Sequence, residues 1–183
     1  MSKLYVNELA PKTAGNKIIM PQGGIIQVQY TQLDTALTQA FTANTDTAFT
    51  DLTVNITPTS TSSIIKLECH LAGEFDDDDI TWDHAMFFFR DTTALKHSGS
   101  FTSSQVGISA LTRTFTDNND SSTAEVGYYT YFDSPNTTSQ VTYKVGINSR
   151  YAGTFYINTT VSTSDSDGNE RFVSNIVATE IAG

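Results

Sequence analysis

The chain has 183 residues, a formal net charge of −10 and a pI of about 4.5. It lacks the cations that displace counterions from phosphate and the ~18-residue apolar run of a membrane span, so we expect no nucleic acid partner and no membrane insertion. Ser and Thr fill about a quarter of the sequence, aromatic residues 11% and charged residues only 16%. Because Thr and aromatic residues favour strands, this composition predicts an all-β protein and excludes a helical bundle.

The first 24 residues differ from the rest of the chain. They hold two of the four prolines, Pro11 and Pro21, and end at Gly23-Gly24. Two short strand-like pieces in this segment are too small to bury their own apolar side chains, and such pieces are marginal alone. The sequence therefore predicts a short extended N-terminal arm over residues 1–24 that packs on another surface or another chain. Its buried positions on assembly would be Leu4, Val6, Ile18 and Ile19.

Residues 25–183 form the predicted head domain, in which apolar and polar residues alternate along short segments. In the clearest of them, Ile65, Leu67, Cys69 and Leu71 share one face. Breaks rich in Asp, Asn and Gly separate the segments. Eight or more short strands with such breaks predict a β-sandwich or jelly-roll head. The expected strands cover residues 25–30, 52–56, 64–71, 82–90, 126–133, 141–147, 155–161 and 172–181.

Two segments break the simple alternation. Leu33, Leu37 and Phe41 fit a helical period, but the five Thr and Asn residues from Thr35 to Thr45 argue against a helix. We predict a strand or an irregular segment there. The segment 82–90 is instead apolar on both faces, which is typical of a central strand covered on both sides or of a strand at an interface.

The sequence offers little for catalysis. It has three histidines and no Gly-x-Ser-x-Gly elbow, and Cys69 falls on the apolar face of its strand. The carboxylates of Asp76–Asp79 and Asp83 could form the acid and base of a glycosidase. Four adjacent aspartates cannot all point into one cleft, however, so a solvated loop is the better interpretation. We therefore expect no catalytic residues and no enzymatic activity.

The Asx-rich turn that contains Asp165 and Asp167 is a candidate cation site. This turn offers the hard oxygen ligands that suit Ca²⁺, but it lacks the spacing of an EF-hand loop. The alternative is an Asx turn that links two strands, and we prefer it. Since Cys69 is the only cysteine, a zinc cluster is not expected either. The sequence thus predicts no metal and no cofactor.

Exposed aromatic rings are the candidate carbohydrate contacts, because the C–H faces of sugars stack on rings. The alternative for each ring is packing in the core or at an interface, and this alternative is favoured. The candidates are Trp82, Tyr129, Tyr131 and Tyr151.

Three stretches resemble virion fibre and appendage proteins of tailed phages, especially those of marine cyanobacterial hosts. The first comprises LYVNEL at 4–9 and TAGNKIIMP at 13–21. The second is FTDLTVNITPTSTSSII at 49–65. The third begins YFDSPNTT at 131–138, continues with VTYKV at 141–145 and ends with GTFYIN at 153–158. Together they span most of the chain in the same order.

The resemblance implies a non-enzymatic virion component with a β-sandwich head on an intertwined trimeric stem. The arm spans at most ~80 Å, so we expect a short fibre or knob on the tail or the capsid. Expected partners are two further copies of the chain, other virion proteins and host surface polysaccharide. The lone cysteine and the absence of an apolar signal segment suggest synthesis in the host cytoplasm. The alternatives are a free-standing carbohydrate-binding module and, less favoured, a glycan-cleaving enzyme.

Overall fold

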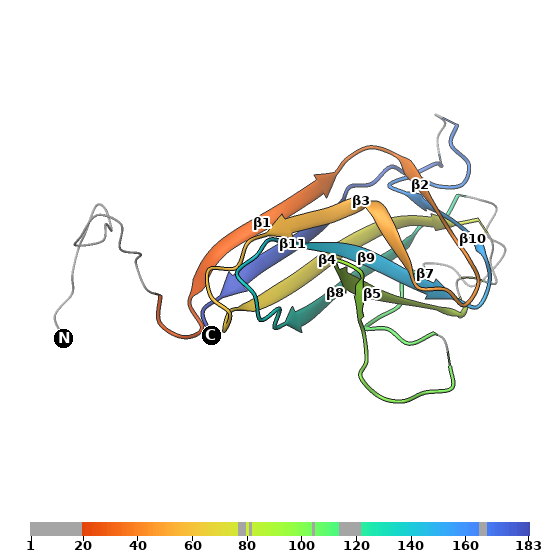
Figure 1. Ribbon diagram of the computed structural model, residues 1–183. Coiled ribbons are helices and arrows are strands. Elements are labelled where there is room, and N and C mark those ends of the chain that lie inside the picture. Colours follow the sequence, from red (N-terminus) through yellow and green to blue (C-terminus); the bar gives the residue numbers. More distant parts are fainter. Residues whose placement is uncertain (1–19, 77–79, 81, 104, 114–121, 165–167) are drawn as a thin grey trace, which may run out of the picture.

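The computed structural model describes residues 20–76, 80, 82–103, 105–113, 122–164 and 168–183. Two sheets pack face to face, so the predicted all-β sandwich is confirmed (Figure 1). The four predicted arm positions Leu4, Val6, Ile18 and Ile19 lie outside the described residues. The first strand begins at Ile25, where we placed the start of the head.

The head contains eleven named strands among the described residues. They are β1 (Ile25–Leu33), β2 (Leu37–Phe41), β3 (Thr47–Ile56), β4 (Ile64–Phe75), β5 (His84–Arg90), β6 (Thr93–Leu95), β7 (Thr112–Arg113), β8 (Glu125–Asp133), β9 (Val141–Ser149), β10 (Gly153–Ile157) and β11 (Ser174–Ile181). The ambiguous segment after Leu33 is therefore a strand, β2, because it pairs with β10 along its whole length. Tertiary pairing overrides the helical spacing of its apolar residues.

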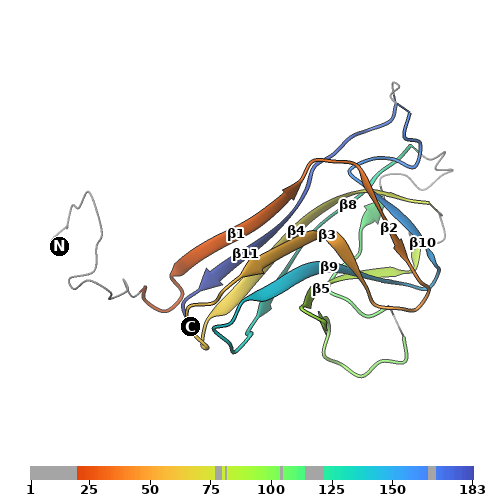
Figure 2. The same cartoon turned by 45° about the horizontal axis from the view of Figure 1, so that its top comes forward.

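The seven strands of sheet A lie in the order β1-β11-β4-β10-β2, with β8 and β7 beyond β4. The four strands of sheet B lie in the order β3-β9-β5-β6. Figure 2 shows β1, β11, β4 and β8 in one layer and β3, β9 and β5 in the other. Strands that follow each other in sequence often lie in different sheets, so the two layers are bound together by the chain path itself.

The long strand β4 organises sheet A. One edge pairs with β8 from Ile65 to Gly73. The other edge pairs first with β11, over Ile64–His70, and then with β10, over Gly73–Phe75. A side chain at Gly73 would collide with the carbonyl oxygen of Tyr156 and the ring of Phe155. The change of partner therefore requires glycine at this point.

The core lies between the sheets and confirms the predicted alternation. Ile65, Leu67, Cys69 and Leu71 are fully buried and point toward sheet B. From sheet B, Val145 and Ile147 of β9 and Phe88 of β5 face them. The prediction that 82–90 contains a central strand is also confirmed, since β5 lies between β9 and β6 and is buried on both faces.

One strand ends earlier than predicted. The alternation suggested a strand over 155–161, but β10 ends at Ile157. Asn158 has a φ of 60°, a left-handed conformation that asparagine tolerates better than most residues. Its side-chain amide donates to the carbonyl oxygen of Leu33 at 2.7 Å and to that of Thr35 at 3.1 Å. These bonds turn the chain and fix the connection between β1 and β2.

Candidate functional site

The outward side of sheet A is unusually apolar for an exposed surface. Antiparallel sheets commonly present polar residues on the face that sheet packing leaves open. Here Tyr30, Tyr128 and Phe132 are 71%, 62% and 58% exposed, and an exposed apolar patch of this kind marks an interaction site. We call this surface the outer face of sheet A. Its exposed apolar side chains are Ile25, Val28 and Tyr30 of β1 and Val126, Tyr128 and Phe132 of β8.

In the middle of strand β1, polar side chains lie on the side that faces sheet B and apolar side chains lie on the side that faces solvent. The register places Gln27 and Gln29 opposite Glu180 and Ala178, which are both buried, while Tyr30 pairs with Val177 on the outer side. Gln27 Nε2 donates to Glu180 Oε2 at 2.6 Å. Gln27 and Gln29 therefore lie on the side of β1 that faces sheet B, whereas Val28 and Tyr30 point outward. Because side chains alternate with a period of two, Leu33 at the end of the strand is again on the inner side, where it packs against the core.

A small polar network crosses the middle of this apolar surface. Lys66 Nζ lies 2.8 Å from Glu68 Oε1, and the Tyr128 hydroxyl donates to the same oxygen. The hydrogen bonds from Lys66 and Tyr128 lower the pKa of Glu68, and the bond to Glu68 raises the pKa values of Lys66 and Tyr128. At neutral pH Glu68 is therefore ionised and accepts hydrogen bonds from both Lys66 and Tyr128. A network that satisfies itself can be covered by a partner without leaving a charge unpaired.

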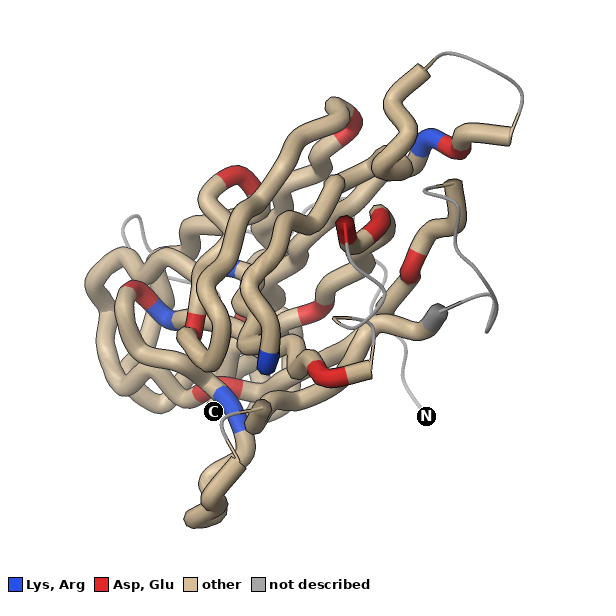
Figure 3. The backbone as a smooth tube through the Cα atoms, turned by 90° about the vertical axis from the view of Figure 1, so that its right-hand side faces the viewer, with Lys and Arg blue, Asp and Glu red and all other residues tan. Residues whose placement is uncertain are grey.

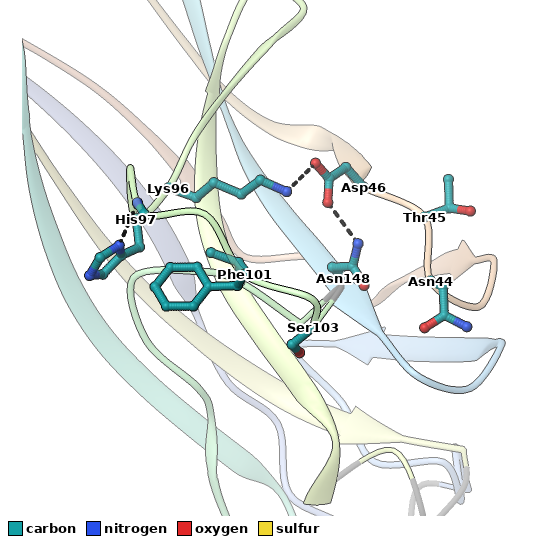
Figure 4. A pocket seen from close by; sticks show the side chains of 10 residues that line it. Asn44, Thr45, Asp46, Lys96, His97, Phe101, Ser103 and Asn148 are labelled. Atoms are coloured by element: carbon teal, nitrogen blue, oxygen red, sulfur yellow. Dashed lines mark hydrogen bonds and ion pairs between the residues drawn. The ribbon is translucent and has the colours of Figure 1, made fainter.

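The opposite side of the sandwich carries a groove of about 600 Å³ (Figure 4). One wall is the connection from β2 to β3, with Asn44, Thr45 and Asp46. The other wall is the connection that follows β6, from Lys96 to Val106. The floor contains Asn148, on the side of β9 that faces away from the core. Gln105 Nε2 donates to Asn44 Oδ1 at 3.0 Å and joins the two walls.

Asp46 is the centre of the polar contacts in the groove. One of its oxygens lies 2.6 Å from Lys96 Nζ, and the other accepts a hydrogen bond from Asn148 Nδ2 at 2.7 Å. Lys96 also lies over the ring of Phe87 on sheet B, 5.3 Å from its centroid. Phe101 and His97 meet edge to face with their centroids 5.0 Å apart. These contacts hold polar side chains in place around the exposed ring of Phe101.

The predicted carbohydrate contacts do not form one site. Trp82 is 65% exposed, in the connection before β5. Tyr129 is only 4% exposed and packs on Phe88 at 5.0 Å, so its ring has no free face for a sugar. Tyr131 and Tyr151 are half-buried against the core, and Arg150 covers the ring of Tyr151. For Tyr129 the structure places the residue in the core, which was the alternative to sugar contact.

Three carboxylates near the ends of β4 and β8 have structural roles. Asp76 Oδ1 accepts the N–H of Thr154 at 2.8 Å, next to the backbone bond from Asp76 to Thr154. Buried Glu74 accepts the N–H groups of Thr123 and Val161, and buried Glu125 accepts that of Phe75. Each of these carboxylates holds a loop or strand end in place. Asp77–Asp79, Asp165 and Asp167 lie outside the described residues.

Neither a metal cluster nor a membrane helix occurs in the part of the chain that the structure describes. No three His, Cys, Asp or Glu side chains there gather closely enough to hold an ion. None of the helical segments there has the length and apolarity that a membrane crossing requires.

The sequence patterns did not predict either the groove or the outer face of sheet A as a site. The groove joins residues more than 100 positions apart, and the phenyl ring that lines it, Phe101, lies in a Ser- and Gly-rich run without alternation. The outer face of sheet A had a weak signal, since Ile26, Val28 and Tyr30 alternate with polar residues. That alternation says that one side of the strand is apolar, but it does not say which side faces the core.

Comparisons with known proteins add no relative. A scan against protein-family models found no match for this chain, and a search of curated proteins found none either.

Proposed function

We propose that this protein is a non-enzymatic structural component of a tailed-phage virion, a short trimeric fibre or knob on the tail or capsid. Residues 1–24 serve as the anchoring arm, and residues 25–183 form the outward head. The resemblance of three ordered stretches to virion appendage proteins supports this role. The observation that carries the proposal is the apolar outer face of sheet A, which a free monomer would leave in water.

The partner on this face is a second copy of the chain. The whole chain has a net charge of −10, so copies repel one another over most of their surface. Figure 3 shows acidic positions distributed over the described backbone and few basic ones. On the outer face of sheet A, Lys66 and Glu68 neutralise each other amid apolar side chains. This face is where two copies approach with the least charge repulsion, and its tyrosines and phenylalanine are typical of interface centres.

The position of the arm supports the same assembly. The N–H of Gly23 donates to the carbonyl oxygen of Ala182, and that of Ala182 donates to Gly24, both at 2.8 Å. The first described residues are thus tied to the end of β11, at the edge of the outer face of sheet A (Figure 1). Arms that start beside this face can meet around one axis once the faces associate. Threefold rather than twofold symmetry is the expectation from the resemblance.

The role in the virion includes contact with host surface polysaccharide. Other partners are the virion proteins that receive the arm, and the protein is assembled in the host cytoplasm and located in the virion. A free-standing carbohydrate-binding module is the second candidate, and the groove on sheet B favours it. The two candidates differ in one property, since the module is a monomer.

The test is the native mass of the full chain beside a shorter chain that starts at Ile25. We expect roughly 60 kDa for the full chain, three times the 20.0 kDa of one copy. Phe132→Glu should reduce that mass, because a charge is costly in an apolar interface. Trp82→Glu is the matched control, since Trp82 is also exposed and lies outside the outer face of sheet A.

The outcomes distinguish assembly through the outer face of sheet A from assembly through the N-terminal arm. If both chains are trimers and Phe132→Glu is a monomer, the face assembles the head and the arm is free to bind the virion. If only the full chain is a trimer, the arm is the device and the face is insufficient alone. If both are monomers at high concentration, the trimer is wrong and the carbohydrate-binding module becomes the better assignment.

A further inference from the structure

We propose that the groove between residues 44–46 and 96–106 binds a neutral saccharide. The inference rests on the proposed host contact for its biological purpose. Its structural support is separate, because it comes from the lining of the groove and not from the outer face of sheet A. It also differs from the sequence-based candidates, since none of Trp82, Tyr129, Tyr131 and Tyr151 lines this groove.

The charge of the lining selects an uncharged ligand. Asp46 and Lys96 are the acidic and the basic side chain of the groove, and they form an ion pair at 2.6 Å. An anionic ligand would find its cation already paired, and a metal ion would find one carboxylate instead of several. An apolar ligand would desolvate Asn44, Thr45 and Ser103 without compensation. A neutral molecule with many hydroxyl groups meets none of these costs.

The remaining groups match the two sides of a sugar ring. The ring of Phe101 is 56% exposed and is held edge to face by His97, so it offers a flat apolar surface to the C–H face of a sugar. His97 Nδ1 accepts the N–H of Gly99 at 2.9 Å. The proton of the neutral imidazole therefore lies on Nε2, which is a hydrogen-bond donor. Hydroxyl groups of the ligand can bond to this donor and to Asn44, Thr45 and Ser103.

Asn148 adds an independent indication of a missing donor. This side chain is 3% exposed and lies on the floor of the groove, where its amide nitrogen is bound to Asp46 (Figure 4). Its Oδ1 is buried and has no hydrogen-bond partner among the described residues. A buried acceptor without a donor is costly and is rare in folded proteins. Solvent does not reach this oxygen in the present arrangement, so a hydroxyl group of the ligand would bond to it after a rotation of the Asn148 side chain.

The groove can hold more than one sugar unit. A second hollow of about 230 Å³ adjoins it and shares His97, Phe101, Ser103 and Val106 with it. Phe101 therefore borders both hollows, and an oligosaccharide can pass along its ring.

The position of the groove agrees with a host-facing role. It lies over sheet B, on the side of the sandwich opposite to the outer face of sheet A. Assembly through sheet A therefore leaves three grooves exposed at the circumference of the trimer. Each single contact in such an open groove is weak, and simultaneous engagement of three raises the overall affinity.

The test is saturation-transfer NMR on the full chain with four neutral trisaccharides: maltotriose, cellotriose, mannotriose and galactotriose. Trigalacturonate is the acidic comparison. We expect saturable binding of at least one neutral trisaccharide and none of trigalacturonate. Phe101→Ala should weaken the binding at least about tenfold, because the stacking surface is lost. Trp82→Ala removes an equally exposed ring that does not line the groove, and it should bind as the unaltered chain does.

Three results would overturn the assignment: binding of trigalacturonate alone, binding that Trp82→Ala abolishes and Phe101→Ala preserves, or no binding of any neutral trisaccharide. The native mass of the same samples separates this inference from the proposed function. A trimer that binds no neutral trisaccharide would keep the proposed virion role and disprove saccharide binding in the groove. A monomer that binds through Phe101 would support saccharide binding in the groove and disprove the trimer.

Discussion

Cys69 shows how burial controls the chemistry of a single side chain. It lies in the core opposite Tyr129 of β8, and desolvation raises the pKa of its thiol to about 12. The thiolate, which is the reactive form, is therefore almost absent in the folded protein at neutral pH.

We predict that Cys69 of the native chain resists an aromatic disulfide reagent at pH 8, while the denatured chain reacts at once. The absorbance of the released thiolate measures the reaction. Since Cys69 is the only cysteine, the native rate reports opening of the sandwich. Comparable rates in the native and the denatured chain would show that Cys69 is not enclosed.

Glu180 is a buried carboxylate with a structural role between the sheets. It accepts hydrogen bonds from Gln27 Nε2, from Thr59 N and Oγ1 and from Ser63 Oγ, at 2.6 to 2.7 Å. Burial alone would raise the pKa of this group, but the hydrogen bonds from Ser63, Gln27 and Thr59 outweigh it, and the pKa is lowered. The ionised form therefore ties the start of β1 and the β3–β4 turn to β11.

We predict that Glu180→Gln lowers the free energy of unfolding by about 1.5–3 kcal/mol at pH 7, measured by urea denaturation. Because the folded pKa lies below the ordinary value of 4.5, the stabilisation is present above that pH and is lost as the pH falls through the folded pKa. The difference between the two proteins should narrow in that range. Glu170→Gln, at an exposed position, should change stability by less than about 0.5 kcal/mol. Equal effects at both positions would contradict the role of Glu180.

At the scale of the element, the change of partner along β4 depends on Gly73. At this residue β4 changes from β11 to β10 on one edge, while β8 continues on the other. The backbone of Tyr156 and the ring of Phe155 fill the space that a side chain would need. A collision with backbone cannot be relieved by a rotamer change.

We predict that Gly73→Ala lowers the free energy of unfolding by about 3 kcal/mol or prevents soluble expression. Gly99→Ala is the matched control. Its added Cβ would meet the ring of Phe101, which is exposed and can move, so the cost should stay near or below about 1 kcal/mol. Thermal or urea denaturation measures both. A tolerated Gly73→Ala would mean that β10 and β4 separate at this point.

At the scale of the molecule, charge and apolar surface act against each other. A net charge of −10 disfavours the association of identical copies, while the outer face of sheet A favours it. Salt screens the first effect, because the Debye length falls from about 30 Å at 0.01 M to about 3 Å at 1 M. Salt does not weaken apolar contacts.

We therefore predict that the association constant of the trimer increases when NaCl is raised from ~0.05 to ~0.5 M. Sedimentation equilibrium measures this constant. An interface made of intermolecular salt bridges would show the opposite trend. A decrease in the association constant with salt would argue against an apolar interface on sheet A.

The sequence by itself determined the fold class and most of the core. Alternation at Ile65, Leu67, Cys69 and Leu71 identified a strand and its buried side, since a polar residue lies between each pair and is expected to point outward. The doubly apolar run before Arg90 identified a central strand. These are local properties, and each depends only on neighbours in the sequence.

Only the tertiary structure decided which side of an alternating strand meets the core. In β1 Val28 and Tyr30 face outward, because the register with β11 places Gln27 beside the buried Glu180. The same holds for β8, where Tyr129 packs inside and Tyr128 remains outside although both are tyrosines. The groove arose in the same way, from Asp46, Lys96 and Asn148, which are far apart in the sequence. Strand pairing joins distant residues, and a one-residue change of register exchanges the two faces of a strand, so the surfaces could not be read from the chain alone.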